Sequence, residues 1–509
     1  MTQPSAPSQT DPPRGAVEPA VFGTTLVAVV ALVSFSALSP ENARAIFLGT
    51  QEFVVRHFGW LLVTAVGIFP LFCVWAAWGR RGRLRLGDDN ERPAYGRLSW
   101  FAMLFTAGMG IGIMFYGVAE PILHYATPPL GGLPDQETAR RALRVTFFHW
   151  GLHAWGAYAV MGLAIAFFSY RRGLPLSIRS PLQPILGDRI HGPIGHLVDI
   201  LAAFGTLFGL ATSLGLGAMQ INAGLGTVAG AQESTLIQVG LIGLITAAAT
   251  VSVVLGVDKG IRRLAEINIA LALALLGFVF LAGPTLDLLK EFGIAVADYL
   301  VQLTPMTFGG GGLGDDSWKE SWTIFYWAWW IAWAPFVGTF IARISRGRTV
   351  REFVLGVLLV PTAASLFWFT VFGWSAISLE MTSGGIAAAV DGDLSVGLYA
   401  LLQRLPVPAA SSILAILVVT IFFITSSDSG SFVIDMLTSG GHPNPPVRQR
   451  VFWALSEGAV AATLLLTGGL AALKAAAINT GLPFALVLLL LCVGLGIALQ
   501  EESSPGDSP

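Results

Sequence analysis

Long apolar runs separated by short polar, Gly or Pro segments dominate this sequence of 509 residues. A helix that spans a bilayer needs roughly 20 predominantly apolar residues. Runs of that length recur along the chain and predict about twelve transmembrane helices, which makes the fold class all-α. Their approximate cores are residues 21–38, 57–78, 98–125, 145–168, 195–224, 235–255, 264–281, 318–344, 353–379, 409–436, 452–470 and 475–499.

One segment has a different pattern. Acidic and basic residues alternate with apolar ones over residues 284–305, which is typical of an amphipathic helix that lies flat in the membrane interface. We expect it on the outer face. The predicted organisation is a cytoplasmic tail at 1–20, two helices and a basic cytoplasmic loop at 21–97, five helices at 98–283, the interfacial helix at 284–305, five helices at 317–499 and a short cytoplasmic tail at 500–509.

Composition agrees with a membrane-embedded chain and narrows its partners. Hydrophobic residues make up 54% of the sequence and charged residues only 12%, which is far from the composition of a soluble domain. The formal net charge of −2 does not indicate a basic surface for binding a nucleic acid. Membrane lipid is the expected surrounding partner. Cys73 and Cys492 lie in apolar runs, and we interpret them as packing residues.

The positions of Lys and Arg predict the orientation. Short cytoplasmic loops are enriched in these residues, and placing the N-terminus inside puts most of the 29 basic residues in cytoplasmic segments. Arg140, Arg141 and Arg144 are the local exception, because they fall together on the outer side. The pattern predicts that both termini are cytoplasmic.

Two of the predicted spans carry residues that disfavour a regular helix. The third contains Gly108, Gly110 and Gly112, and the eighth contains Pro335 and Gly338. Small residues can simply allow close helix packing. Alternatively, both spans are interrupted in mid-membrane, which in corresponding halves of a chain indicates a transport site built on an inverted repeat. The separation of the two spans suggests repeats of five helices.

Aromatic residues concentrate in the fourth and eighth spans. Trp150, Trp155 and Tyr158 lie within about 140° on one side of an ideal helix. Such residues often form an interfacial belt, yet four indoles within seven residues are denser than a belt requires. Aromatic faces can instead hold a quaternary ammonium by cation–π attraction, at about 0.5 to 2 kcal/mol per contact. The indoles of the eighth span are Trp327, Trp329, Trp330 and Trp333.

A hydroxyl-rich patch interrupts the tenth span at residues 425–429. The hydroxyls can hydrogen-bond to the preceding helical turn, or they can supply oxygen ligands to a sodium ion. Asp428 is an acid inside the membrane and thus a functional candidate, or it can brace neighbouring loops through hydrogen bonds.

Three motifs resemble the betaine/carnitine/choline transporter family. They are GMGIGIMFYGVAEP at 108–121, FYWAWWIAWAPF at 325–336 continuing into ARISRGR at 342–348, and the hydroxyl patch at 425–431. The resemblance extends over residues 20–499. It implies twelve helices in a LeuT-like arrangement, with helices 3–7 and 8–12 forming the inverted repeat. It also implies a homotrimer in the bacterial inner membrane, with the interfacial helix at the subunit contact.

The resemblance also implies roles for individual residues. The aromatic box maps onto Trp150, Trp155, Tyr158 and Trp330, with Trp329 and Trp333 lining the pathway and Gly108, Met109, Gly110, Ile111 and Gly112 beside the substrate. One sodium ion would be held by backbone oxygens of Thr106, Met109 and Phe422 and by the hydroxyls of Thr425 and Ser426. A second sodium site is suggested near Thr206 and Phe336, but Leu210 stands where sodium-coupled carriers are expected to have a hydroxyl residue, so the stoichiometry stays open.

These observations predict sodium-coupled uptake of glycine betaine or a related trimethylammonium solute, with sodium as coupling ion and no other cofactor. The predicted spans 195–224 and 264–281 contain no Lys or Arg that could replace sodium, which favours symport. A proton-coupled carrier of choline, carnitine, ectoine or dimethylsulfoniopropionate is the alternative. An enzyme is not expected, because His124, His149 and His153 are the nearest approach to an ionisable cluster and we interpret them as packing or loop contacts. The short C-terminal tail argues against osmotic activation through that tail.

Overall fold

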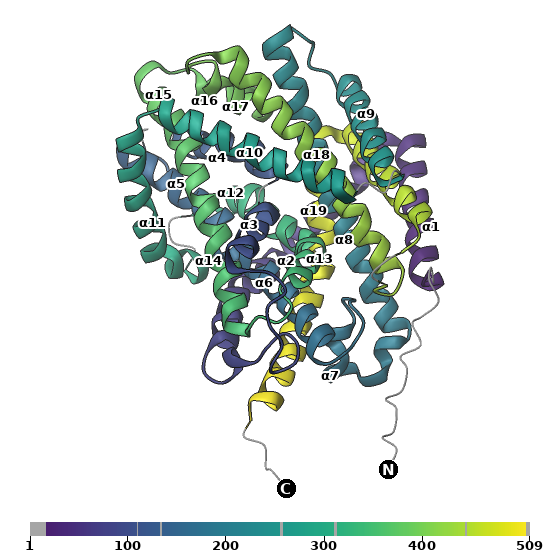
Figure 1. Ribbon diagram of the computed structural model, residues 1–509. Coiled ribbons are helices and arrows are strands. Elements are labelled where there is room, and N and C mark those ends of the chain that lie inside the picture. Colours follow the sequence, from purple (N-terminus) through teal and green to yellow (C-terminus); the bar gives the residue numbers. More distant parts are fainter. Residues whose placement is uncertain are drawn as a thin grey trace, which may run out of the picture.

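A computed structural model describes residues 17–504, apart from residues 109, 133–134, 255–257, 310–312 and 443–444, and for residues 105–108 and 258–262 only the backbone. Helices form the whole architecture of this part of the chain (Figure 1). The only extended pairing found in it is a single bridge between Arg85 and Thr349. The predicted all-α class is confirmed.

The α-helices follow one another as a bundle of long, closely packed elements. They are α1 (Pro19–Leu38), α2 (Pro40–Ala77), α3 (Arg97–Gly108), α4 (Ile111–Ala126), α5 (Gln136–Trp150), α6 (Leu152–Ala166), α7 (Gln183–Leu186), α8 (Pro193–Ala229), α9 (Thr235–Val254), α10 (Asp258–Ala282), α11 (Thr285–Phe308), α12 (Asp316–Lys319), α13 (Phe325–Ile344), α14 (Val350–Phe369), α15 (Ser375–Ser383), α16 (Ile386–Gly392), α17 (Gly397–Leu402), α18 (Pro408–Thr438) and α19 (Val447–Ser503).

Short helical turns of different pitch connect or extend these helices. The 3₁₀ turns are η1 (Arg81–Arg83), η3 (Ser180–Leu182), η4 (Gly187–His191) and η7 (Leu394–Val396). The wider π turns are η2 (Phe167–Arg171), η5 (Glu320–Ile324) and η6 (Thr370–Trp374), and each continues an α-helix without a gap.

Ten helical segments among the described residues are long and apolar enough to cross a membrane. The longest of them, α19, contains two residues with non-helical backbone angles, Gly468 and Gly469, and Gly469 has a φ of +58° that favours glycine. The chain is therefore a multi-pass helical membrane protein. The segment α11, predicted to lie in the interface, is one continuous helix and is not among the ten.

The two ends of the described chain lie on the same face of the molecule. Glu18, at the start, forms an ion pair with Arg179 at 3.6 Å, and Glu502, near the end, pairs with Arg171 and Arg172. All three arginines belong to the segment between α6 and α8. We call this side the termini face.

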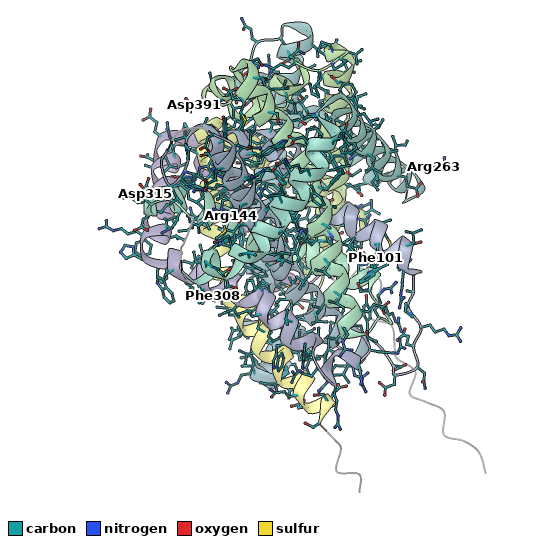
Figure 2. All side chains as sticks on the ribbon, turned by 90° about the vertical axis from the view of Figure 1, so that its left-hand side faces the viewer. Phe101, Arg144, Arg263, Phe308, Asp315 and Asp391 are labelled. Carbon is teal, nitrogen blue, oxygen red and sulfur yellow. The ribbon has the colours of Figure 1, made fainter. Side chains whose placement is uncertain are left out.

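The three arginines that depart from the expected charge pattern have acidic partners. Arg140 makes a two-pronged contact with the buried Glu291, at 2.7 and 2.8 Å. Arg144, labelled in Figure 2, bonds Asp298 at 3.0 Å, and Arg141 pairs with Glu137 of its own helix. Glu291 and Asp298 belong to α11, so these charges fix α11 against α5.

The helix breaks agree with only part of the prediction. The interruption of the third span is confirmed, because α3 ends at Gly108 and Gly110 is extended before α4. The interruption expected at Pro335 and Gly338 is wrong, since α13 is helical through both positions. Gly338 serves packing instead, because a Cβ atom there would lie 2.2 Å from Met161 of α6.

A further break was not expected. Gly151 separates α5 from α6, so Trp150 does not lie on the same helix as Trp155 and Tyr158, and the angular placement on one ideal helix does not apply. A Cβ atom at Gly151 would lie 2.5 Å from the carbonyl oxygen of Phe147 and 2.6 Å from the hydroxyl of Tyr299, so only glycine fits without a shift.

Candidate substrate cavity

A cavity of about 50 Å³ lies among α4, α6, α8, α13 and α14 and next to the break at Gly110. Eight residues singled out from the sequence line it together, although they come from segments up to 223 positions apart in the chain. These residues are Gly110, Gly112, Trp150, Trp155, Tyr158, Trp329, Trp330 and Trp333; the other lining residues are Ile113, Ala154, Ser213, Val337 and Ser365.

The aromatic rings in this wall are arranged largely edge to face. Trp150 meets Trp330 with ring centres 4.8 Å apart at 68°, and Tyr158 meets Trp330 at 6.4 Å and 78°. Trp155 contacts Tyr158 at 5.4 Å and 82°. We call these four residues the aromatic cage. Perpendicular rings present π faces in different directions, which is how aromatic residues surround an onium cation.

The two described glycines of the third span have different surroundings. A Cβ atom at Gly110 would meet no atom within 4 Å, because this position faces open space at the cavity. A Cβ atom at Gly112 would lie 2.8 Å from Trp329 and 3.1 Å from Trp150. Gly112 therefore lets two indoles approach the backbone. Ile111, which was grouped with them, is buried against Gly217 of α8, and Met109 lies outside the described residues.

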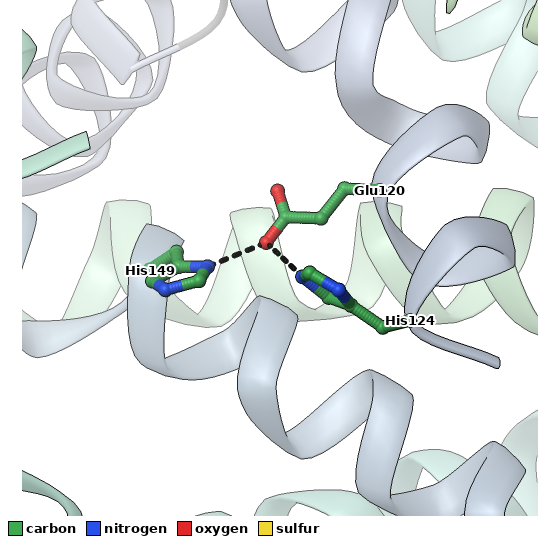
Figure 3. A group of neighbouring side chains, drawn as sticks. All are labelled: Glu120, His124 and His149. Atoms are coloured by element: carbon green, nitrogen blue, oxygen red, sulfur yellow. Dashed lines mark hydrogen bonds and ion pairs between the residues drawn. The ribbon is translucent and has the colours of Figure 1, made fainter. Parts of the chain in front are cut away.

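A buried acid that sequence reasoning missed holds part of this wall. Glu120 of α4 is fully buried, and its Oε2 accepts hydrogen bonds from the Trp150 indole at 2.7 Å and from the Tyr326 hydroxyl at 2.5 Å. Its Oε1 lies 2.7 Å from His149 Nδ1 and 3.4 Å from His124 Nε2 (Figure 3). We call these five residues the Glu120 network.

The network also fixes the second indole of the cage. The Trp330 indole donates to the backbone carbonyl of His149 at 2.9 Å, and the other ring nitrogen of His149 lies 2.9 Å from the Thr323 hydroxyl. Two cage rings are thus anchored by their N–H edges, which leaves their faces for the cavity. The sequence carries a signal for Glu120, because an acid within an apolar span is a functional candidate by default.

The histidines are more than packing residues. Ligand atoms of Glu120, His124 and His149 lie within 4.8 Å of one another, as they would in a metal site. However, both oxygens of Glu120 and both ring nitrogens of His149 already have protein partners, which describes a satisfied hydrogen-bond network. His153 lies apart from it, with Nε2 at 2.9 Å from Thr307 of α11.

The hydroxyl patch lies in a continuous helix, α18. Thr425 donates to the carbonyl of Ile421 at 2.9 Å and approaches that of Phe422 at 3.2 Å, and Ser427 donates to Glu457 at 3.1 Å. Ser426 is partly buried one position away. The proposed partners from the third span cannot be compared, because Met109 and the side chain of Thr106 lie outside the described residues.

At the suggested second sodium site, Thr206 is buried and its hydroxyl has no hydrogen-bond partner among the described residues, while Phe336 is partly buried. Leu210, one turn further along α8, fills the space against α18. A Cβ atom at Gly430 would lie 2.1 Å from its Cδ1. An aliphatic side chain therefore occupies the place where a third oxygen ligand would be expected.

The side chain of Lys474 lies beside the aromatic wall. The Lys474 ammonium is 4.7 Å from the centre of the Phe325 ring and 5.4 Å from that of Trp322. Phe325 stacks on Trp329 at 5.4 Å, and Trp329 stacks on Trp330 at 4.9 Å. The aromatic surface is thus continuous from Lys474 to the cage.

A multi-pass helical bundle with a cavity at a helix break is the architecture of a membrane transporter. Comparison with known proteins identifies the kind: the model of the betaine/carnitine/choline family transporters matches residues 20–504, and the chain belongs to this family. It is therefore a transporter and not an enzyme.

Similar proteins cover nearly the whole chain. The chain is 43% identical over 500 residues to a glycine betaine transporter of Acinetobacter baylyi, which covers 98% of this chain and 76% of that protein. It is 43% identical over 485 residues to the glycine betaine transporter OpuD of Bacillus subtilis, with 95% and 94% covered. A glycine betaine/proline/choline transporter of Vibrio parahaemolyticus is 42% identical over 499 residues, with 95% and 90% covered.

Proposed function

We propose that this protein carries out sodium-coupled uptake of glycine betaine, or of a closely related trimethylammonium solute, by alternating access. The observation that carries the proposal is the cavity, in which Trp150, Trp155, Tyr158 and Trp330 meet at steep angles. Several cation–π contacts of about 0.5 to 2 kcal/mol each can hold a trimethylammonium group without a carboxylate partner.

The remaining polar groups of the cavity suit the other end of a betaine. The indole N–H groups of Trp329 and Trp333 have no hydrogen-bond partner among the described residues, and both residues line the cavity. Indoles donate and cannot accept hydrogen bonds. They match a carboxylate, which only accepts. The glycine betaine transporters among the relatives support the same class of solute.

The sodium part of the proposal depends on the hydroxyl patch of α18. A Thr or Ser hydroxyl that donates its proton to a helix carbonyl keeps lone pairs that can face a cation. Thr425 is in this state, and Ser426 lies beside it. With the carbonyl of Phe422 and backbone oxygens of Thr106 and Met109, these groups would form a site for one sodium ion, and Leu210 argues against a second one near Thr206 and Phe336.

Twelve spans and a LeuT-like inverted repeat of helices 3–7 and 8–12 are part of this proposal. Two features support the count: the break at Gly468 and Gly469 divides α19 into two pieces of spanning length, and α3 with α4 provides one further interrupted span. The basic residues of the termini face support a cytoplasmic location for both ends. The trimer, with α11 at its contact, is proposed on the family resemblance alone.

Transport assays with purified protein in liposomes test the proposal. We expect uptake of labelled glycine betaine that requires an inward sodium gradient and is blocked by excess unlabelled betaine. Uptake driven equally well by a proton gradient without sodium would instead establish the proton-coupled alternative. Uptake of neither glycine betaine nor choline under any gradient would reject the proposed substrate class.

A further inference from the structure

The proposed function gives no role to Lys474. It is half-buried in α19, five positions after the backbone break at Gly469, and it forms no ion pair within 4 Å among the residues that the structure describes. Its contacts are the faces of Trp322 and Phe325. A lone ammonium held on aromatic rings has much the same chemistry as the onium group that the cage is proposed to bind.

The helices place Lys474 on the side of the cage away from the termini face. From Lys474 to Glu501, which pairs with Arg172 on the termini face, α19 is one helix of about 40 Å. The other helix, α13, runs from Phe325 past the cage indoles to Ile344, close to the termini face. Lys474 and Phe325 therefore lie behind the aromatic wall, on the side of the cage away from the termini face.

Glu120 is close enough for its charge to act on Lys474, although the two side chains form no ion pair within 4 Å. The acid of the Glu120 network is already bonded to the Trp150 indole, the Tyr326 hydroxyl and His149. Its oxygens are thus directed to those donors. The ammonium on the rings keeps its hydrogen-bonding capacity for a group that arrives from outside.

A fixed positive charge beside the cage acts differently on two solutes that share one headgroup. Choline carries a net positive charge, so Lys474 repels it. Glycine betaine carries the same trimethylammonium group and a carboxylate, so it has no net charge, and the attraction of the carboxylate to the ammonium offsets the repulsion of the headgroup. The low dielectric of a partly buried site makes both effects larger than they are in water.

We propose that Lys474 is a specificity-determining residue whose charge, behind the aromatic wall, makes the cage select zwitterionic trimethylammonium solutes over cationic ones. The selection deepens the proposed function and rests on it, because it presupposes that the cage binds a trimethylammonium group.

The test measures equilibrium binding in detergent, where no membrane potential favours a cation. Binding of glycine betaine and of choline is followed by indole fluorescence for the wild type, Lys474→Met and Lys474→Arg. We expect the preference of the wild type for betaine over choline to fall by about tenfold in Lys474→Met and to persist in Lys474→Arg. If Lys474→Met does not fold, Lys474→Gln provides the same comparison.

The outcomes distinguish a failure of this proposal from a failure of the proposed function. An unchanged preference in the uncharged variants, or an equal loss of both affinities, would show that Lys474 only supports packing and would overturn the inference. A wild type that binds neither solute would reject the cage itself. If the wild type binds choline as tightly as betaine, the cage is supported but the selection by Lys474 is overturned.

Discussion

The aromatic cage and the hydroxyl patch of α18 differ in how far the protein has assembled them. In the cage, the N–H edges of Trp150 and Trp330 are bonded to Glu120 and to the carbonyl of His149, so the ring faces are already directed at a cavity. In the patch, the hydroxyl of Thr425 is bonded to a carbonyl oxygen of its own helix.

This difference suggests a division of labour. A site whose rings are held in advance loses little conformational entropy when the solute binds. A site whose oxygens are shared with a helix backbone needs additional ligands from another segment before it can hold a hard cation. We therefore expect mutations in the cage to change solute affinity directly, and mutations in the patch to change the dependence on sodium.

The largest effect should come from removing a cage face. Trp330→Ala deletes a ring that contacts both Trp150 and Tyr158. We expect the loss of high-affinity uptake, with affinity for glycine betaine weakened by about 30-fold or more. The matched control is Trp60→Ala, which removes an exposed indole of α2. Wild-type affinity in the Trp330 variant would count against the cage.

A smaller effect is expected from loosening the support of the cage. Glu120→Gln keeps the size of the side chain but removes the negative charge that accepts hydrogen bonds from the Trp150 indole and the Tyr326 hydroxyl, so these bonds become weaker neutral ones. We expect about tenfold weaker betaine binding in a protein that still folds. Thr323→Val, which removes only the outer hydrogen bond of His149, should weaken binding less. Equal effects of the two variants would contradict a positioning role for Glu120.

Mutations in the hydroxyl patch should change the sodium dependence of uptake. In Thr425→Ala with Ser426→Ala, we expect the sodium concentration for half-maximal uptake to rise by about tenfold while betaine affinity at saturating sodium changes little. Thr420→Ala is the control, because Thr420 has the same hydrogen bond to its own helix without belonging to the patch. An unchanged sodium titration in the double variant would reject the ion site.

The smallest effect is expected at Glu233, which lies outside both regions, and it concerns the pH dependence of stability. Hydrogen bonding to Asp393, together with partial burial and the charge of that acid, raises the pKa of Glu233 in the α8–α9 loop to about 7. A raised carboxyl pKa means that the protonated form stabilises the fold. This contribution is complete below the ordinary Glu pKa and is lost as the pH rises through about 7. The unfolding temperatures at pH 5 and pH 8 should therefore differ less in Glu233→Gln than in the wild type. The same difference in both proteins would contradict a stabilising interaction between Glu233 and Asp393.

Patterns that depend on local composition were predictable from the sequence. Apolar runs gave the helices, and the glycines at 108–112 gave the break between α3 and α4. The glycine and aromatic patterns, together with the family resemblance, also identified eight of the residues that line the cavity.

Features that depend on a three-dimensional neighbour were missed. Pro335 looked like a helix break because its ring removes a backbone donor, yet α13 stays helical through it and packs closely on α6. Gly151, which does end α5, has the same local signal as many packing glycines. Glu120 and Lys474 each appear in the sequence as a lone charge in an apolar region, and only folding shows that their partners come from other helices.

The central claim is that ring faces recognise the positive charge of the solute and not merely its shape. Binding of glycine betaine can be compared with binding of its tert-butyl analogue, 3,3-dimethylbutanoate, in which carbon replaces the quaternary nitrogen and the carboxylate is kept. The account predicts that purified protein binds glycine betaine at least about 30-fold more tightly. Equal affinity for the two compounds would contradict it.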